Sequence, residues 1–229
     1  MKRIGLIGGM SWESTAHYYE AINKQVSGRL GGLHSADILV HSLDFAPVAT
    51  MQEEGRWDEA GALLAESASL LEAAGCDLIG LATNTMHKLA PAIEAAISVP
   101  FIHIADPTAK ALLADGYQRV GLLGTRFTME MPFYIERMAE LGVETFPPGV
   151  DHTNLNGIIY EELCKGVVRD ESRAVYVSAI ERMQMMGAEA VILGCTEIGM
   201  LITDDDSPLP VFDTTELHAA ALADAALAD

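Results

Sequence analysis

An internal repeat constrains the fold of this chain more than any other feature of its sequence. Three pairs of segments match in the same order: Ile4–Gly8 with Val120–Gly124, Gly75–Thr85 with Gly187–Glu197, and Val99–Ile102 with Leu209–Phe212. Their offsets are 116, 112 and 110 residues, so the register drifts little along the chain. One such match would carry little weight, because glycine-flanked apolar strands are common. Three matches in order predict a duplicated structure with two similar halves.

Short apolar runs alternate with stretches of helical periodicity in both halves. We expect β-strands at Ile4–Ile7, Asp37–Ser42, Leu78–Ala82, Phe101–Ile104, Val120–Leu123, Ala190–Leu193 and Val211–Phe212. Continuous apolar strands separated by helices are typical of parallel sheets that are covered on both faces. The sequence therefore predicts an α/β fold with two pseudo-symmetric open α/β domains, mainly parallel sheets and a cleft between the domains.

Periodicity and capping residues predict helices around these strands. Apolar residues recur every fourth position from Tyr18 onward, and Ser11 is suited to be the N-cap of that helix. A second helix is expected over residues 57–74, followed by Gly75 at its C-terminal end. The last helical pattern, over residues 215–228, is expected to pack back on the first half.

The repeat also sets the expected domain boundaries, because no low-complexity linker separates the halves. We assign residues 1–98 and 212–229 to the first α/β domain and residues 99–211 to the second. Open α/β sheets bind ligands beyond the carboxyl ends of their strands. The loops expected to face a ligand are therefore residues 8–14, 83–87, 124–128 and 195–199.

The charge balance narrows the classes of partner. The chain carries 14 Lys and Arg residues against 33 Asp and Glu residues, a net charge of −19 at pH 7. Nucleic acid and anionic membrane surfaces are therefore not expected as partners, because both need clustered basic residues. A transmembrane helix is not expected either, because Pro91, Glu94 and Pro100 interrupt the most apolar long stretch. We interpret the short apolar run at Ile4–Met10 as a strand rather than a signal peptide.

Cysteine and histidine spacing predicts neither a disulfide framework nor a metal site. Cys76, Cys164 and Cys195 are an odd number of widely spaced cysteines, which fits a cytoplasmic protein. The seven histidines show no His-x-His or His-x-x-x-His pair, so no metal is expected. The glycines at residues 8–9 depart from Gly-x-Gly-x-x-Gly, and no phosphate-binding loop is present, so no cofactor is expected.

Thr83 and Cys195 occupy matched positions in the repeat, each at the end of an apolar strand. In two facing halves they are expected to approach one point from opposite sides. We expect main-chain N–H dipoles at the following turn to lower the pKa of the Cys195 thiol from about 8.5. A thiolate can remove a proton from carbon or attack an electrophile. The alternative is a buried cysteine that acts as a small hydrophobic residue, which is how we interpret Cys76 and Cys164.

Neutral polar side chains gather at the same strand ends. This set comprises Asn84, Thr85, Thr125, Thr128 and Thr196. Taken singly, such residues are helix caps and turn residues, but together they are suited to bind the carboxylate or amino group of a small ligand. The main-chain N–H groups around Met10 and Ser11, where a helix begins, are also suited to a carboxylate. His87 and Glu197 are candidates for proton shuttles or orienting groups.

These residues together resemble the motifs of the aspartate/glutamate racemase family. The resemblance rests first on Asn84-Thr85 after one strand and on Gly194-Cys195-Thr196-Glu197 after the other. The segments at residues 8–15 and 30–35 resemble its aspartate racemase branch, and those at 124–128 and 161–166 also fit. The resemblance extends over essentially the whole chain.

The resemblance implies two pseudo-symmetric α/β domains with an active site between them, commonly in a homodimer. It also implies racemisation without pyridoxal phosphate, in which one residue takes the α-proton and another returns a proton to the opposite face. By position, these two residues are Thr83 and Cys195. The neutral polar set would bind substrate carboxylates with the Met10, Ser11 and Glu197 segments, and Lys165 matches a basic residue near the distal carboxylate.

The chain departs from the family pattern at two places. The usual pair is two cysteines, whereas the first position here is Thr83, whose hydroxyl is a far weaker acid than a thiol. An enzyme in which the two directions of proton transfer are not equally easy to initiate is therefore a hypothesis. Near Phe45–Pro47 some members carry an arginine that is absent here, and Gln52 is a candidate for a weaker binding role.

We therefore expect an isomerase that interconverts the L and D forms of aspartate, glutamate or both. Two alternatives remain open from the sequence. One is a single-cysteine reaction, either decarboxylation of a malonate or cis–trans isomerisation of a dicarboxylate, in which only Cys195 is essential. The other is a non-catalytic protein that binds a dicarboxylate.

Overall fold

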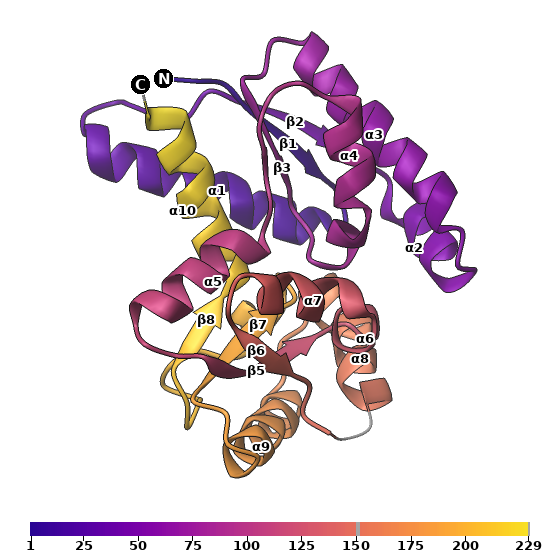
Figure 1. Ribbon diagram of the computed structural model, residues 1–229, viewed down its shortest axis with the longest axis vertical. Helices are drawn as coiled ribbons and strands as arrows, with labels where there is room; N and C mark the ends of the chain where they lie inside the picture. The colour runs from indigo at the N-terminus through magenta and orange to yellow at the C-terminus, as the bar shows by residue number, and fades with distance from the viewer. Residues whose placement is uncertain (150–151, 229) are drawn as a thin grey trace. The chain divides into compact units, whose positions relative to one another are not determined.

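Two four-stranded parallel sheets form the framework of the chain (Figure 1). In this computed structural model, which describes residues 1–149 and 152–228, the chain divides into two units. The first unit comprises Met1–Ile104 together with the residues from His218 onward, and the second comprises Ala105–Leu217. The predicted α/β fold with two parallel-sheet halves is confirmed.

The two sheets have the same strand order. The first is β2 (Ile38–Ser42), β1 (Ile4–Gly8), β3 (Leu78–Leu81) and β4 (Phe101–Ile102); the second is β6 (Glu144–Phe146), β5 (Arg119–Gly124), β7 (Ala190–Gly194) and β8 (Val211–Asp213). The repeated sequence segments thus become β1 and β5, β3 and β7, and β4 and β8, at equivalent places in the two sheets. This equivalence is what the internal repeat predicts.

Helices connect successive strands in both units. Those that begin in the first unit are α1 (Trp12–Leu30), α2 (Phe45–Glu53), α3 (Trp57–Ala73), the 3-10 helix η1 (Thr85–Leu89) and α4 (Ala90–Ala96). Those that begin in the second are α5 (Ala105–Ala114), α6 (Arg126–Glu130), α7 (Pro132–Glu140), α8 (His152–Glu161), η2 (Leu163–Lys165), α9 (Asp170–Met185), η3 (Ile198–Met200) and α10 (Thr214–Leu227). All but the first four residues of α10 belong to the first unit.

The first sheet is covered on both faces. Ile4 and Leu6 of β1 belong to a core cluster with side chains of α1 and α10, whereas Ile7 belongs to a cluster with side chains of α3 and α4. Successive strand residues point to opposite faces, so a strand covered on both sides must be apolar throughout. Figure 1 shows α1 and α10 on one side of this sheet and α3 and α4 on the other. The expected packing of the last helix on the first half is confirmed by Leu222 and Ala226 in this core.

The second unit has its main apolar cluster between the sheet and helices α8 and α9. Leu123 of β5 and Leu193 of β7 pack there with Leu155 of α8 and with Tyr176 and Ile180 of α9. Helix α5 contacts β8 and α7. A bidentate ion pair, in which Arg137 Nε and Nη2 each lie 2.9 Å from an Asp106 oxygen, joins α5 to α7.

The structure differs from the sequence-based expectation at the edges of the sheets. Strand β6 was not expected, because it has only three residues and its Glu144 is exposed. The unit boundaries follow Ile104 and Leu217, rather than residues 98 and 211. The reason is strand pairing: β4 is bonded to β3 and therefore belongs to the first sheet, while β8 is bonded to β7 in the second.

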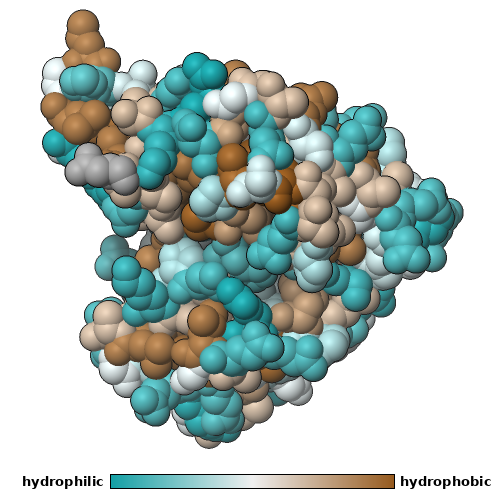
Figure 2. Space-filling model, turned by 45° about the horizontal axis from the view of Figure 1, so that its top comes forward, coloured by the Kyte–Doolittle hydropathy of each residue, from teal (hydrophilic) through white to brown (hydrophobic). Residues whose placement is uncertain are grey.

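The surface is mixed in character. On the face drawn in Figure 2, hydrophobic residues form separate small patches among hydrophilic ones. Within the described residues, no helix combines the length and the apolar character that crossing a membrane requires.

The turn after β1 depends on a glycine. Gly9 has φ of 89°, a left-handed conformation that L side chains rarely adopt. A Cβ added there would also overlap the main-chain amide and carbonyl of Leu43. Gly9 N–H donates to Thr15 Oγ1 at 2.7 Å, and Leu43 N–H donates to the Gly8 carbonyl at 3.0 Å. The glycine therefore allows the main chain after β2 to approach the end of β1.

Gly9→Ala is expected to lower the free energy of unfolding by more than about 2 kcal/mol. The overlap of the new Cβ with the main chain of Leu43 adds to the cost of placing an alanine in a left-handed conformation. Gly116→Ala is the matched control, because Gly116 has φ of 86° but no atom within 4 Å of an added Cβ. It should cost only about 1–2 kcal/mol, the left-handed penalty alone. Urea unfolding measures both. Equal losses in the two variants would contradict the role assigned to close packing at Gly9.

Candidate active site: two strand-end half-sites

The buried loop with Thr83, Asn84 and Thr85, which we call the first half-site, follows β3. Strand β3 is the parallel neighbour of β1 in the first sheet. Ile7 pairs with Leu81, and Ala82 N–H donates to the Ile7 carbonyl at 2.9 Å. The loop that carries Thr83 therefore begins beside the end of β1. The side chains of Thr83, Asn84 and Thr85 are all buried. The parallel pairing thus places the start of this buried polar loop beside the end of β1.

His87 holds this loop through its main chain. Its Nδ1 lies 2.7 Å from the Thr83 carbonyl oxygen, and its Nε2 accepts a hydrogen bond from Ile104 N–H at 3.1 Å. Burial, together with the nearby His103 and His218, lowers the pKa of His87 well below its usual value. Since both ring nitrogens are engaged by main-chain groups, the geometry supports the orienting role for His87 over the shuttling one.

Met10, Ser11 and Gln52 also lie at this end of the first sheet. Ser11 is the N-cap of α1, where its Oγ accepts from Ser14 N–H at 3.2 Å, as the sequence predicts. Met10 packs in the same core cluster as Met86 of η1. Gln52 is buried on α2, and its Nε2 lies 2.9 Å from the sulfur of Met86. Gln52 thus contacts the helix that follows the Thr83 loop.

The second half-site follows β7, beside β5. Cys195 Sγ donates to Glu197 Oε2 at 3.0 Å, and the Thr196 hydroxyl donates to the same oxygen at 2.7 Å. All three side chains are buried, and Cys195 is only 6% exposed. A buried thiol hydrogen-bonded to a buried carboxylate is an acid–base pair, because the carboxylate can accept the thiol proton.

The expected lowering of the Cys195 pKa is wrong. Burial raises the pKa of this thiol well above its usual value, and the Glu197 carboxylate and Cys164 raise it further. The main-chain hydrogen bond from Glu197 at this turn does lower the pKa of the thiol, but it is the smallest of these effects. The resting thiol is therefore protonated, and Glu197 is the group placed to remove its proton.

Thr125 and Thr128 lie at the end of β5, next to this pair. Thr125 is the N-cap of α6, where its Oγ1 accepts from Thr128 N–H at 3.3 Å, and the two hydroxyls are 3.2 Å apart. Gly124 pairs with Gly194 across β5 and β7, and a Cβ on Gly124 would lie 2.8 Å from the Gly194 carbonyl oxygen. The two glycines thus let the threonine turn and the cysteine turn begin side by side.

Other candidates are placed differently. Lys165 is exposed at the end of η2. Cys76 lies in the core of the first unit, where burial raises its pKa. No sequence pattern points to Tyr176, whose buried hydroxyl donates to the Leu155 carbonyl at 3.0 Å. Burial raises the pKa of Tyr176, and Cys195, Glu197 and Cys164 add to that shift, so the tyrosine belongs to the surroundings of the thiol.

Comparison with known proteins identifies the family. Residues 7–222 match the Asp/Glu/Hydantoin racemase family, and the chain belongs to it. The broad specificity amino-acid racemase RacX of Bacillus subtilis (strain 168) is 23% identical over 215 residues, which cover 93% of this chain and 92% of the relative.

Solved structures agree with the assignment of the chain to this family. A Yersinia pestis protein assigned as an Asp/Glu racemase is 48% identical, with 100% of both chains covered and a TM-score of 0.92. An aspartate racemase homologue from Pyrococcus horikoshii OT3 is 34% identical, with 99% of both chains covered and a TM-score of 0.83.

Glu197→Gln is expected to make Cys195 more reactive toward iodoacetamide near pH 8, by about threefold or more. Removing the carboxylate charge lowers the thiol pKa, so more thiolate is present at a given pH. Alkylation followed peptide by peptide with mass spectrometry measures this rate, and Cys76 in the same sample is the internal control. Unchanged or slower alkylation of Cys195 would contradict the charge effect.

A buried histidine near the first half-site predicts acid sensitivity. Tyr18 Oη lies 2.8 Å from His218 Nδ1, and His218 Nε2 lies 2.8 Å from the Ile102 carbonyl oxygen, so the neutral ring satisfies both contacts. Burial lowers the pKa of His218 from 6.5 to about 4. Between these values the unfolded chain binds more protons than the folded one. The free energy of unfolding should therefore fall as the pH decreases, by about 2 kcal/mol from this group between pH 7 and pH 5.

Urea unfolding across this pH range tests the effect with two variants. His218→Gln removes the titrating group, so its stability should depend less steeply on pH than that of the wild type. His34→Gln is the control, because His34 is an exposed histidine in the loop after α1. Parallel pH profiles for the wild type and His218→Gln would contradict the assignment.

Proposed function

We propose that this protein is a cofactor-independent racemase that interconverts the L and D forms of aspartate, glutamate or both. The observation that carries the proposal is the buried Cys195–Glu197 pair at the end of β7, in a chain of the Asp/Glu/Hydantoin racemase family. Thr83 stands at the equivalent place after β3. In this proposal both half-sites act on one substrate, from opposite faces of its Cα.

Cys195 supplies one of the two proton-transfer groups in this scheme. Its thiol gives its proton to Glu197, and the resulting thiolate takes the α-proton of the enantiomer that presents Cα–H to it. The proton held on Glu197 then exchanges with solvent. A buried carboxylate that already accepts hydrogen bonds from Cys195 and Thr196 is well placed for this, because the transfer needs no rearrangement of the pair.

The Thr83 side returns a proton to the opposite face of Cα. A hydroxyl is a poor base but can donate a proton to a carbanion, directly or through a bound water, and is then restored by the proton that left Glu197. Deprotonation is therefore initiated more readily from the Cys195 side. The equilibrium still contains equal amounts of L and D, because a catalyst changes only the barriers.

Neutral donors hold the substrate in this proposal. The carboxylates are bound by Asn84, Thr85, Thr125, Thr128 and Thr196, together with the turn at Met10 and Ser11. Such donors stabilise the negative charge that develops on the α-carboxylate when the proton leaves. Gln52 supports the first half-site through Met86, and Lys165 is assigned to the distal carboxylate from the family resemblance alone. The same resemblance suggests a homodimer.

Proton NMR in D₂O with L-Asp, L-Glu and their D forms tests the proposal, with purified protein and no added cofactor. We expect the Cα–H signal of at least one acidic amino acid to disappear. One enantiomer should also acquire deuterium faster than it is converted to the other, because Cys195 initiates exchange more readily than Thr83. No loss of signal from any of the four would refute acidic-amino-acid racemisation, and malonate and maleate-type substrates and plain dicarboxylate binding would be tested next.

Two variants separate the proton-transfer roles. Cys195→Ser should reduce racemisation by about 100- to 10,000-fold, the range for loss of a positioned acid–base group. Thr83→Ala should also abolish racemisation, but the enantiomer served by Cys195 should still exchange its α-proton with retention of configuration. Cys76→Ser, in the core of the first unit, is the matched control. It should leave both the rate of racemisation and the rate of α-proton exchange unchanged. Full racemisation by Thr83→Ala would contradict the proton-returning role assigned to Thr83.

A further inference from the structure

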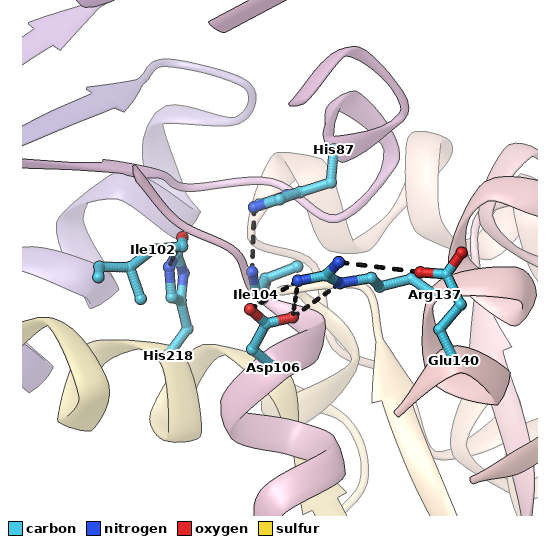
Figure 3. Close-up of polar contacts among 7 residues, drawn as sticks. All are labelled: His87, Ile102, Ile104, Asp106, Arg137, Glu140 and His218. Atoms are coloured by element: carbon cyan, nitrogen blue, oxygen red, sulfur yellow. Dashed lines mark hydrogen bonds and ion pairs between the residues drawn. The ribbon is translucent and has the colours of Figure 1, made fainter. Parts of the chain in front are cut away.

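His87 makes a hydrogen bond through each of its two ring nitrogens. Its side chain comes from η1, four residues after Thr83, and reaches back to the Thr83 carbonyl with Nδ1 at 2.7 Å. The opposite ring nitrogen, Nε2, is 3.1 Å from the main-chain nitrogen of Ile104. Figure 3 shows the His87 ring directed toward Ile104. One imidazole thus joins the loop that carries Thr83 to the main chain that follows β4.

The two partners determine which nitrogen carries the proton. A carbonyl oxygen can only accept, so Nδ1 must carry the hydrogen that binds Thr83. A main-chain N–H can only donate, so Nε2 must be unprotonated to bind Ile104. The neutral Nδ1–H tautomer satisfies both contacts, and neither the other tautomer nor the charged ring does. The lowered pKa of His87 agrees with a ring that stays neutral.

The His87 ring is buried and packed against two other histidine rings. His87 is only 2% exposed, and its ring centroid lies 4.5 Å from that of His103 and 5.9 Å from that of His218. Loss of either hydrogen bond would remove a contact that the buried ring makes with the main chain, which is costly. The ring is thus a fixed support for the main chain at Thr83.

We propose that His87 is a positioning residue that fixes the Thr83 carbonyl and thereby the direction of the Thr83 hydroxyl. It does not touch the reacting atoms. Its effect on the reaction rests on the proposed racemase function, whereas its effect on the conformation of Thr83 does not. Two kinds of measurement are therefore needed, one on conformation and one on proton transfer.

Two substitutions of His87 each keep one of its two hydrogen bonds and remove the other. The amide nitrogen of His87→Asn lies at the place of Nδ1, so this variant keeps a donor for the Thr83 carbonyl and loses the acceptor for Ile104. The amide of His87→Gln reaches the place of Nε2, so this variant keeps an acceptor for Ile104 and loses the donor for Thr83. His218→Gln is the control for removing a buried histidine that does not contact Thr83.

NMR measures the conformational effect without any substrate. In the wild type, long-range ¹⁵N–¹H correlations should show His87 as the neutral Nδ1–H tautomer. Scalar couplings should show one χ1 rotamer of Thr83 in the wild type, His87→Asn and His218→Gln, and rotamer averaging in His87→Gln. An Nε2–H tautomer in the wild type, or an equally fixed Thr83 in His87→Gln, would overturn the proposal whether or not the protein is a racemase.

Proton transfer supplies the second measurement. In D₂O, the ratio of racemisation to exchange with retention should fall at least tenfold in His87→Gln and stay within threefold of the wild type in His87→Asn and His218→Gln. A variant that is merely less stable would lower both rates together and leave the ratio unchanged. An unchanged ratio in His87→Gln would therefore also overturn the proposal. Absence of exchange in the wild type would instead refute the racemase function and leave the rotamer result to decide the role of His87.

Discussion

Parallel pairing of the two central strands in each sheet is the constraint on which both half-sites depend. Because β1 and β3 run in the same direction, the turn at Gly9 and the loop at Thr83 emerge at one edge. The pairing of β5 with β7 does the same for Thr125 and Cys195. Glycines at these strand ends remove the side chains that would keep the turns apart. The main-chain pairing of the strands therefore brings these polar residues to one edge of each sheet.

The group that holds the buried residues by hydrogen bonds is neutral in one half-site and charged in the other. At Thr83 the support is neutral, because the His87 ring binds main-chain groups on both sides. At Cys195 it is ionic, because the Glu197 carboxylate accepts from two neighbouring side chains. A neutral support fixes geometry without shifting the charge of its neighbour, whereas an anionic one also changes the acidity of the thiol. This difference agrees with a threonine on one side and a cysteine on the other.

The sequence was informative where burial and periodicity coincide. Apolar strands, the Ser11 cap and the equivalent places of Thr83 and Cys195 in the repeat followed from local patterns. Strand β6 did not, because a three-residue edge strand with an exposed Glu144 has little hydrophobic signal. The Cys195 pKa was predicted in the wrong direction, because burial and the orientation of Glu197 are tertiary properties. The His87 contacts were equally hidden, since Ile104 is 17 residues away and offers only a main-chain N–H.

The last helix has a consequence for how the chain folds during synthesis. Ala219, Leu222, Ala223 and Ala226 belong to the core of the first sheet, together with Ile4 and Tyr18. Domains usually fold as units while the chain leaves the ribosome. Here the first sheet cannot complete its core until α10 has emerged, after the whole second unit. The unit that is translated first is therefore the one that finishes folding last, and nascent chains that stop before α10 should expose an uncovered apolar face to chaperones.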